Sequence, residues 1–441
     1  HGLSLLGVPV VGSVDALQDV IRQREIHRIL LAIPSAGPSL VRRVSREAEA
    51  MGVPLQTVPG LQERIRGSVS LRDVRDVSIE DLLGRQEIKI DLEGVARLLS
   101  GRRILITGGG GSIGSEIARQ VAMFEPASLT LLDHDETHLS DAAVSLMAGV
   151  TTLLADIRDE DRMMREFARL QPEIVFHAAA HKHVPILEQF PGEAVATNVV
   201  GTQHVVRAST AVGVDRLVLI STDKAVRPTS VMGASKWLAE QIVIGQAPAE
   251  SPYCAVRFGN VLGSRGSVVP IFARQIAAGG PVTVTDPRMT RYFMSIQEAV
   301  QLVLQASVFA SGREVFMLEM GEAVNILSLA RHMIHLAGYG PGSEIPVEIT
   351  GARPGEKVVE ELCAPMEEPS GTDHEAIVRL EPVLLPSPTL DGCIELLVRL
   401  TGEDDAGEAA RTMLALANGS VHRSGLFDRL VTSGVGRPAH Q

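Results

Sequence analysis

The sequence is poor in aromatic residues, in cysteine and in long uncharged runs. Aromatic residues make up 3% of the 441 residues, with a single Trp. The three cysteines, Cys254, Cys363 and Cys393, include no Cys-x-x-Cys pair, so they indicate neither a zinc cluster nor a disulfide framework and favour a reducing compartment. Uncharged runs such as 142–155 are shorter than the roughly 20 residues that span a bilayer. We therefore expect no transmembrane helix in this chain.

Positive charge is also in deficit. The chain has 41 Lys and Arg against 53 Asp and Glu, a formal net charge of −12. Such a surface repels phosphate backbones and anionic lipid headgroups, so we expect no nucleic-acid partner. A hydrophobic content of 45% is ample for buried cores, and the length predicts two or three domains. The chain begins at His1 and enters an apolar segment directly, so we expect that an upstream portion is missing.

The first part of the chain has the pattern of a small α/β domain. Strand-like segments at 29–33 and 53–58 flank a probable helix at 38–51, which predicts a Rossmann-like unit over 1–62. Charged, turn-rich sequence follows, and we interpret residues 63–100 as a connector between domains.

A second α/β region begins at a short apolar strand, 103–107, which runs into a glycine cluster and an amphipathic helix through Val121. Further short strands are expected at 129–133, 152–155, 174–177, 217–221 and 254–258. Helical patterns lie between most of them, as parallel βαβ units require. The fold class is therefore α/β, with a Rossmann-like doubly wound parallel sheet at 101–259. Glycine-punctuated residues 260–365 would form a substrate lobe, and 366–441 a C-terminal extension.

The sharpest local signal is the spacing of Gly108, Gly111 and Gly114 between a strand and a helix. Small residues let the backbone turn tightly and let a pyrophosphate approach the helix N-terminus. Asp133 ends the next strand about 20 residues later, where a carboxylate can bind ribose hydroxyls and repel a 2′-phosphate. This pattern favours NAD, with NADP as the alternative; a glycine-rich turn without a ligand is the structural alternative. Asp156 could similarly meet the adenine, or be a solvated loop aspartate.

The glycine spacing, Asn198 and the run 221–224 (STDK) resemble the extended short-chain dehydrogenase/reductase group. Its members normally carry Tyr-x-x-x-Lys. In this chain Met232 and Lys236 stand at that spacing, and methionine cannot accept a proton. Either the chain is an inactive nucleotide binder, or other groups replace the tyrosine.

Several further motifs occur in order and together are specific: HAAAHKHVP, STDKAVRP, RFGNVLGS, RYFM and RPGEK, at 177–185, 221–228, 257–264, 291–294 and 353–357. With the first domain they resemble the membrane-linked UDP-N-acetylglucosamine 4,6-dehydratases of polysaccharide and glycan biosynthesis, over residues 1–365. Members of that family carry transmembrane helices ahead of the first domain. The resemblance thus implies a UDP-sugar substrate, a homo-oligomer, and a full-length protein on the cytoplasmic face of the inner membrane, which this fragment would join only through its missing segment.

The resemblance implies a reaction without net redox change. The sugar C4 hydroxyl is oxidised by hydride transfer to NAD, water leaves across C5 and C6, and the hydride returns to C6. Thr222 would hydrogen-bond O4, Asp223 would protonate the departing C6 hydroxyl, and Lys224 would take the C5 proton. Lys236 would hold the nicotinamide ribose. The alternatives are a sugar-nucleotide 4-epimerase and a non-catalytic NAD or UDP-sugar sensor.

By the same resemblance, further cofactor contacts come from Ser112, Ile113, Ile157, Ala178 and Ala179, and substrate contacts from Lys182, Asn198, Asn260, Arg291, Arg353 and Glu356. Guanidinium groups bind phosphate oxygens in bidentate fashion, so Arg291 and Arg353 are candidates for the UDP diphosphate. Each could instead form a surface ion pair, and Asn260 could be a turn residue.

The predicted chemistry makes geometric demands. Side chains alternate along a strand, so Thr222, Asp223 and Lys224 converge only if the strand ends near Ser221. Lys224 must be neutral to act as a base, and Asp223 must be protonated to act as an acid. The trio could also be a simple charged turn. No protein base for the O4 proton is evident, so we expect a bound water to relay it. His177, His181 and His183 lack a matching ligand pattern, so no metal is expected.

Overall fold

The computed structural model describes residues 4–5, 7–33, 38–58, 75–76, 89–146, 149–248, 251–339, 345–402 and 405–419. The chain forms two compact units. One comprises residues 1–88, 266–294 and 321–351, and the other residues 89–265, 295–320 and 352–441. Most of the predicted connector, 63–100, lies outside the described residues. Each predicted domain is one continuous stretch of sequence, whereas each of these units combines several separate stretches. The predicted domain boundaries stay a prediction.

The N-terminal residues form the expected small α/β arrangement. The strands β3 (Ile29–Leu31) and β4 (Leu55–Thr57) pair in parallel and flank helix α2 (Pro38–Ala50) in the sequence. A short strand, β5 (Arg75–Asp76), pairs antiparallel with β4. Leu31, Val41, Val44, Ala48 and Leu55 form its core. The remaining elements there are β1 (Ser4–Leu5), β2 (Val8–Pro9), η1 (Val14–Ala16) and α1 (Leu17–Arg24).

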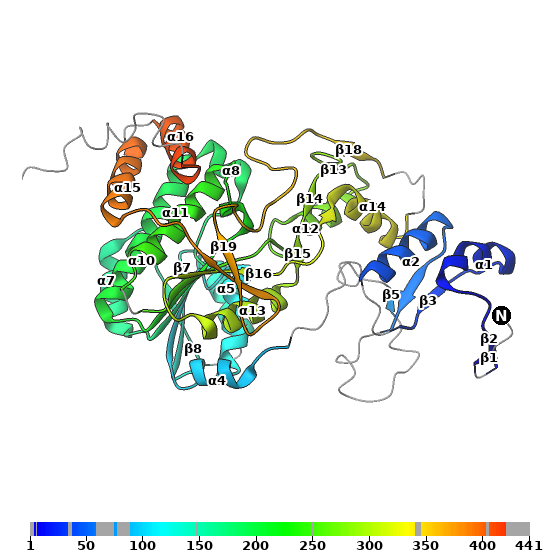
Figure 1. The fold of residues 1–441 in the computed structure, drawn as a ribbon, viewed down its shortest axis with the longest axis horizontal. Helices are drawn as coiled ribbons and strands as arrows, with labels where there is room; N and C mark the ends of the chain where they lie inside the picture. Colours follow the sequence, from blue (N-terminus) through cyan, green and yellow to red (C-terminus); the bar gives the residue numbers. More distant parts are fainter. Residues whose placement is uncertain are drawn as a thin grey trace, which may run out of the picture. The chain divides into compact units, whose positions relative to one another are not determined.

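The other unit is built on a nine-stranded sheet in the order β19-β20-β16-β11-β10-β9-β6-β7-β8 (Figure 1). Its parallel strands are β6 (Arg103–Thr107), β7 (Ser128–Asp133), β8 (Val150–Leu154), β9 (Ile174–His177), β10 (Arg216–Ile220), β11 (Tyr253–Arg257) and β16 (Glu314–Leu318). The antiparallel edge consists of β20 (Ile377–Glu381) and β19 (Glu368–Gly371). This confirms the predicted Rossmann-like doubly wound sheet and adds an edge from the C-terminal extension.

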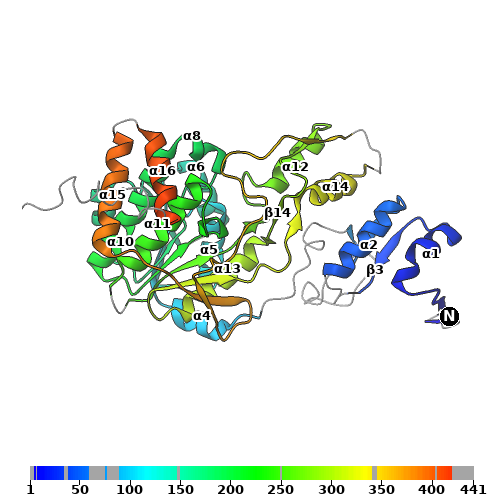
Figure 2. The ribbon, with the colours of Figure 1, turned by 45° about the horizontal axis from the view of Figure 1, so that its top comes forward.

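Helices cover both faces of this sheet, which explains why its central strands are apolar along their whole length. Every residue of β9 and β11 is buried. On one face α4 (Leu92–Leu99), α5 (Ser112–Ala122) and α13 (Ile296–Phe309) pack together, and on the other α7 (Glu160–Leu170), α10 (Thr202–Val212) and α11 (Val231–Gly245). Figures 1 and 2 show α15 (Ser387–Gly402) and α16 (Ala406–Ala417) beside α11. The shorter elements are α6 (Glu136–Ser145), α8 (Val184–Gln189), α9 (Pro191–Glu193), η3 (Ala194–Gly201), η4 (Asp223–Ala225) and β12 (Asn260–Val261).

The interleaved segments of the first unit contain short paired strands and two helices. β13 (Val282–Val284) pairs in parallel with β18 (Val347–Ile349), and β14 (Thr290–Arg291) pairs antiparallel with β17 (Val324–Asn325). The helices are α12 (Val268–Ala277) and α14 (Ile326–Leu336), and β15 (Phe293–Met294) ends the first segment.

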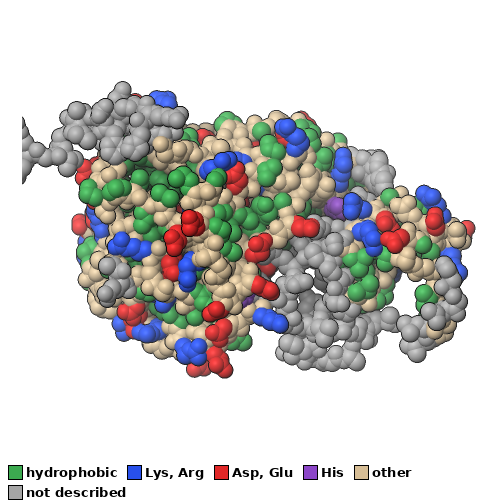
Figure 3. Space-filling view, in the orientation of Figure 1, with side chains coloured by type: hydrophobic (Ala, Val, Ile, Leu, Met, Phe, Trp, Pro, Cys, Tyr) green, Lys and Arg blue, Asp and Glu red, His purple; other side chains and the backbone are tan. Residues whose placement is uncertain are grey.

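Surface character and membrane-spanning potential follow from the same structure. Acidic and basic side chains are interspersed over the face shown in Figure 3.

Among the described residues, no helix combines the length and the apolar character needed to cross a bilayer.

Candidate active site

The glycine loop joins β6 to α5, and its backbone packs directly against neighbouring backbone atoms. Gly108 has φ +68°, and a Cβ atom there would lie 2.6 Å from the backbone nitrogen of Ala179. A Cβ atom on Gly114 would overlap the carbonyl oxygen of Gly108. Only glycine satisfies both positions. Ser112 and Ile113 open α5.

The same contact places the glycine loop beside the loop that follows β9. The nitrogen of Ala178 donates a 3.0 Å hydrogen bond to the carbonyl oxygen of Thr107, at the end of β6. The neighbours of β6 in the sheet are β7 on one side and β9 on the other, so the strand order reverses here. In doubly wound sheets, ligands bind in the crevice at such a switch point, at the carboxyl ends of the strands.

Asp133 closes the crevice at the end of β7 and is 9% exposed. One carboxylate oxygen accepts a 2.9 Å bond from the nitrogen of Gly110, and the other a 3.0 Å bond from the nitrogen of Asp135. Asp156 instead pairs with Arg158, at 2.6 Å. Burial opposes ionisation of Asp156, but the hydrogen bonds from Arg158 outweigh it and lower the pKa of Asp156. Ile157 is buried, and its side chain lies against the position of Gly201 in η3.

Asn198, predicted to bind substrate, holds the loop after β9. Its Oδ1 atom accepts a 2.8 Å bond from the nitrogen of His181, and its Nδ2 atom donates to the carbonyl oxygen of His181 and to Ser235. These bonds make Asn198 a positioning residue for the loop that carries Lys182, which is exposed. Direct contact between Asn198 and a substrate stays a prediction.

The histidines of this region have local partners. His177 is fully buried, with Nδ1 2.6 Å from Thr107 Oγ1 and Nε2 3.0 Å from Thr202 Oγ1. Burial lowers the pKa of His177 to about 3, so the ring is neutral. No group of three His, Cys, Asp or Glu side chains in the described ranges is arranged to hold a metal ion.

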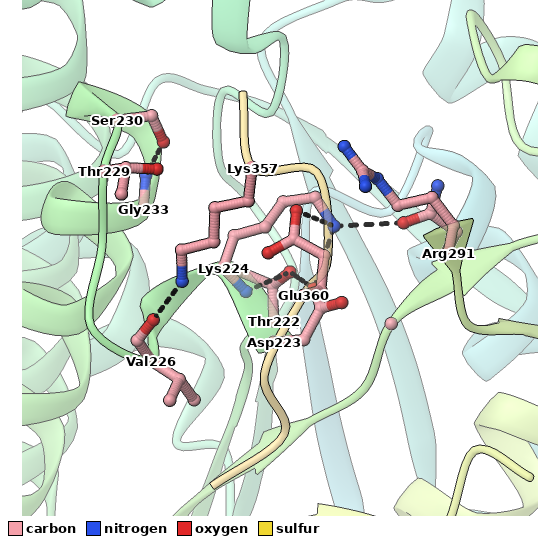
Figure 4. A network of polar contacts seen from close by, with 12 residues as sticks. Thr222, Asp223, Lys224, Val226, Thr229, Ser230, Gly233, Arg291, Lys357 and Glu360 are labelled. Atoms are coloured by element: carbon pink, nitrogen blue, oxygen red, sulfur yellow. Dashed lines mark hydrogen bonds and ion pairs between the residues drawn. The ribbon is translucent and has the colours of Figure 1, made fainter. Parts of the chain in front are cut away.

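The turn that follows β10 brings the predicted trio together. β10 ends at Ile220, Thr222 is extended, and Asp223 begins a 3₁₀ turn. Thr222 Oγ1 donates a 2.8 Å bond to Asp223 Oδ1, and Lys224 Nζ donates a 2.9 Å bond to the same oxygen (Figure 4). Asp223 is fully buried. Lys224 Nζ also donates to Asn260 Oδ1 at 3.0 Å, so a predicted substrate residue contacts the predicted base.

A segment after Ala352 is fastened to this turn. The Lys357 ammonium donates a 2.7 Å bond to the carbonyl oxygen of Val226 (Figure 4). Thr229 Oγ1 donates to the carbonyl oxygen of Gly355. Glu360 Oε1 lies 3.8 Å from Lys224 Nζ, and the Glu360 side chain is 4% exposed. Glu360 was missed by the sequence analysis, although it lies only three positions beyond the RPGEK motif.

Helix α11 places Met232 and Lys236 one turn apart, both buried. Lys236 Nζ donates a 2.7 Å bond to the carbonyl oxygen of Ile220. Burial lowers the pKa of Lys236 to about 8, and the negative charge of Glu240 offsets part of this effect.

The remaining predicted substrate residues include the two candidate ligands of the diphosphate, Arg353 and Arg291. Arg353 is exposed, and its backbone nitrogen donates a 3.1 Å hydrogen bond to Glu356 Oε2. Arg291 belongs to the other unit, is 7% exposed and donates from Nη1 to the carbonyl oxygen of Thr290. The sequence analysis also missed Arg265, which donates from Nη1 to the carbonyl oxygen of Gly110 and from its backbone to Ser112 Oγ.

Residues 104–382 match the family described as polysaccharide biosynthesis protein. The chain belongs to this family. It is 44% identical over 369 residues to the probable polysaccharide biosynthesis protein EpsC of Bacillus subtilis, and 42% identical over 363 residues to the capsular polysaccharide biosynthesis protein CapD of Staphylococcus aureus. These matches cover 82% and 80% of this chain but only 62% and 60% of the relatives.

Other similarities extend over a smaller part of the chain. The UDP-glucose 4-epimerase of Rickettsia typhi is 35% identical over 272 residues, which cover 60% of this chain and 78% of that protein. The solved structure of Pen from Bacillus thuringiensis is 35% identical, with a TM-score of 0.56 over 60% of this chain and 84% of that one. DesIV of Streptomyces venezuelae, a dTDP-glucose 4,6-dehydratase solved with NAD, shares the fold at 22% identity, with a TM-score of 0.53 over 59% and 88% of the two chains.

Proposed function

We propose that this chain is the catalytic part of a nucleotide-sugar 4,6-dehydratase acting in polysaccharide or glycan biosynthesis. The observation that carries the proposal is the arrangement at Asp223, one oxygen of which is bound by both Thr222 and Lys224. A 4,6-elimination needs a group that accepts the O4 proton, an acid for the C6 hydroxyl and a base for the C5 proton. A cluster around the buried carboxylate of Asp223 supplies all of these.

We propose NAD as the cofactor, because the glycines let the loop turn tightly into the N-terminus of α5, where backbone N–H groups can bind a pyrophosphate, and because Asp133 lies at the edge of the loop. Gly108, Gly111 and Gly114 would hold the pyrophosphate, with Ser112, Ile113, Ala178 and Ala179 around it, and Lys236 would hold the nicotinamide ribose. When bound, the cofactor would accept a hydride from C4 and return it to C6.

The hydrogen bond from Thr222 to Asp223 supports a proton path that replaces the missing tyrosine. Thr222 Oγ1 can accept the O4 proton while it passes its own proton to Asp223 Oδ1, 2.8 Å away. Asp223 is then the protonated acid that the departing C6 hydroxyl requires. The proton from Thr222 leaves in the water, and the O4 proton remains on Thr222 in its place. This relay needs no bound water, in contrast to the expectation from the sequence.

The proton balance closes at Lys224. In its neutral form Lys224 takes the C5 proton as water leaves, and it returns a proton to C5 when the hydride reaches C6. Asp223 ends as a carboxylate and Lys224 as an amine, the states in which they began. Met232 takes no part in any proton transfer.

By the family resemblance, we propose UDP-N-acetylglucosamine as substrate, with Arg291 and Arg353 as candidate ligands of the diphosphate and Asn260, Lys182 and Glu356 as candidate contacts. We also propose that the full-length protein is a homo-oligomer at the cytoplasmic face of the membrane, anchored by a segment outside this chain.

Incubation of the chain with NAD and UDP-N-acetylglucosamine, followed by mass spectrometry, tests the proposal. A product lighter by one water supports dehydration. The 35% identity to a UDP-glucose 4-epimerase makes epimerisation the second candidate, for which the product has unchanged mass and altered configuration at C4. Unaltered substrate would leave only a binding function and overturn both.

A further inference from the structure

A buried ion network lies next to the reactive turn and includes no residue that the mechanism uses. Arg257, at the end of β11, donates from Nε and Nη2 to the two carboxylate oxygens of Glu240, at 2.8 and 2.7 Å. From Nη1 it donates to Glu367 at 2.9 Å. The side chains of Arg257 and Glu240 are 3% and 2% exposed. Burying such charges is costly, and losing one partner leaves an uncompensated charge.

A hydroxyl group connects the network to the turn. Ser221 Oγ donates a 2.5 Å bond to Glu240 Oε1, and Ser221 directly precedes Thr222. Glu240 lies on α11, one turn after Lys236, whose ammonium binds the carbonyl oxygen of Ile220. Helix α11 therefore holds the two residues ahead of the trio, one through Lys236 and the other through Glu240.

The charge of Glu240 also acts on Lys236. Burial lowers the pKa of Lys236 to about 8, and Glu240 is the charged group that raises it. The ring of His177 from β9, whose own pKa is about 3, and the carbonyl oxygen of Ile220 from β10 also face Lys236, and both are neutral. Glu240 thus stabilises the ammonium form of Lys236.

We propose that Glu240 is a positioning residue of the active site, which fixes the turn 222–224 through Ser221 and presents its negative charge to Lys236 one helical turn away. Arg257 orients the Glu240 carboxylate by binding both of its oxygens. Glu367 binds the remaining Nη1 group of Arg257 and contributes a second negative charge. The inference rests on the proposed function for its kinetic consequences, but the protonation of Lys236 can be measured without catalysis.

The test compares three single variants of the full chain with bound NAD. For Glu240→Gln we expect kcat to fall at least about tenfold and the alkaline limb of the pH profile to move to lower pH, because the ammonium loses its counter-charge. For Ser221→Ala we expect kcat to fall at every pH, because the turn loses its bond to Glu240. The alkaline limb of the pH profile should stay at the wild-type pH, because the charge of Glu240 is kept. Glu367→Gln removes a charge from the same network without touching Ser221 or Lys236, so the limb should stay in place.

The titration of Lys236 is followed independently by carbon NMR of the lysine side chains, with Lys236→Met for assignment. A lower titration midpoint in Glu240→Gln, but not in Glu367→Gln, supports the proposal. Equal shifts in both variants, or none in Glu240→Gln, overturn it. If Glu240→Gln does not fold, unchanged kcat in Ser221→Ala overturns the positioning role and a fall supports it. If the wild-type chain dehydrates no nucleotide sugar, the proposed function fails while the NMR comparison still decides the inference.

Discussion

The ammonium of Lys236 lies 2.7 Å from the carbonyl oxygen of Ile220, the last residue of β10. In the Tyr-x-x-x-Lys arrangement, the lysine acts beside a tyrosine of its own helix. Here that position is Met232, and the proposed proton-transfer groups follow strand β10 instead. The bond joins helix α11 to the start of the turn 222–224, so Lys236, the proposed ligand of the nicotinamide ribose, and the proposed proton-transfer groups are held together.

Replacing Lys224 with Ala should lower kcat by at least about 100-fold while NAD retention is unchanged, because the C5 proton loses its acceptor. Product formation is followed by mass spectrometry, and retained NAD by absorbance after gel filtration. Lys224→Arg is the matched control, since it keeps a cation near Asp223 but is a poor base, and it should be equally inactive. An active Lys224→Arg enzyme would mean that Lys224 acts only through its charge.

Replacing Thr222 with Val should lower kcat by about 10- to 1000-fold, because the O4 proton loses its path to Asp223. Thr222→Ser keeps the hydroxyl and should keep most of the activity. Steady-state kinetics of both variants at several pH values provide the measurement. Near-normal turnover by Thr222→Val would show that the O4 proton leaves by another route.

Replacing Asp133 with Ala should weaken NAD binding, because the side chain lies at the edge of the glycine loop and holds the nitrogen of Gly110. Isothermal titration calorimetry measures the affinity. Asp135→Ala is a suitable control, because it removes the N-cap bond to the nitrogen of His138 but leaves the bond from the nitrogen of Gly110 to Asp133 in place. Unchanged NAD affinity in Asp133→Ala would place the ribose elsewhere.

The buried neutral ring of His177 should make the fold sensitive to acid. Its pKa is about 3 when folded and about 6.5 when unfolded, so between these values the unfolded chain binds more protons and stability falls as the pH falls. The loss should approach about 1.4 kcal/mol per pH unit below pH 6. Urea unfolding at pH 7 and pH 5 should show a smaller difference for His177→Gln than for the wild type. His27→Gln, at an exposed site, should behave as the wild type. Equal acid sensitivity in all three proteins would rule out His177 as the cause.

The double winding of the sheet and the glycine loop could be predicted from the sequence because both depend on local chemistry. Apolar strands separated by amphipathic helices leave few arrangements for a parallel sheet, and a tight turn before a helix demands glycine at Gly108 and Gly114. The trio 222–224 was also visible as a motif, through its family resemblance. The sequence pattern did not show that residues 368–381 add two antiparallel strands to the sheet, because that pairing depends on distant β16.

Tertiary structure alone decided how the motif residues face one another. Whether Thr222 and Lys224 share Asp223 depends on β10 ending at Ile220, and this end is set by contacts with β11 and α11 rather than by the letters STDK. Glu360 and Glu240 reach the turn from segments far along the chain, and no spacing rule links them to it. The sequence determines which backbone conformations and chemical groups are present, whereas long-range packing determines which of those groups lie within hydrogen-bonding distance.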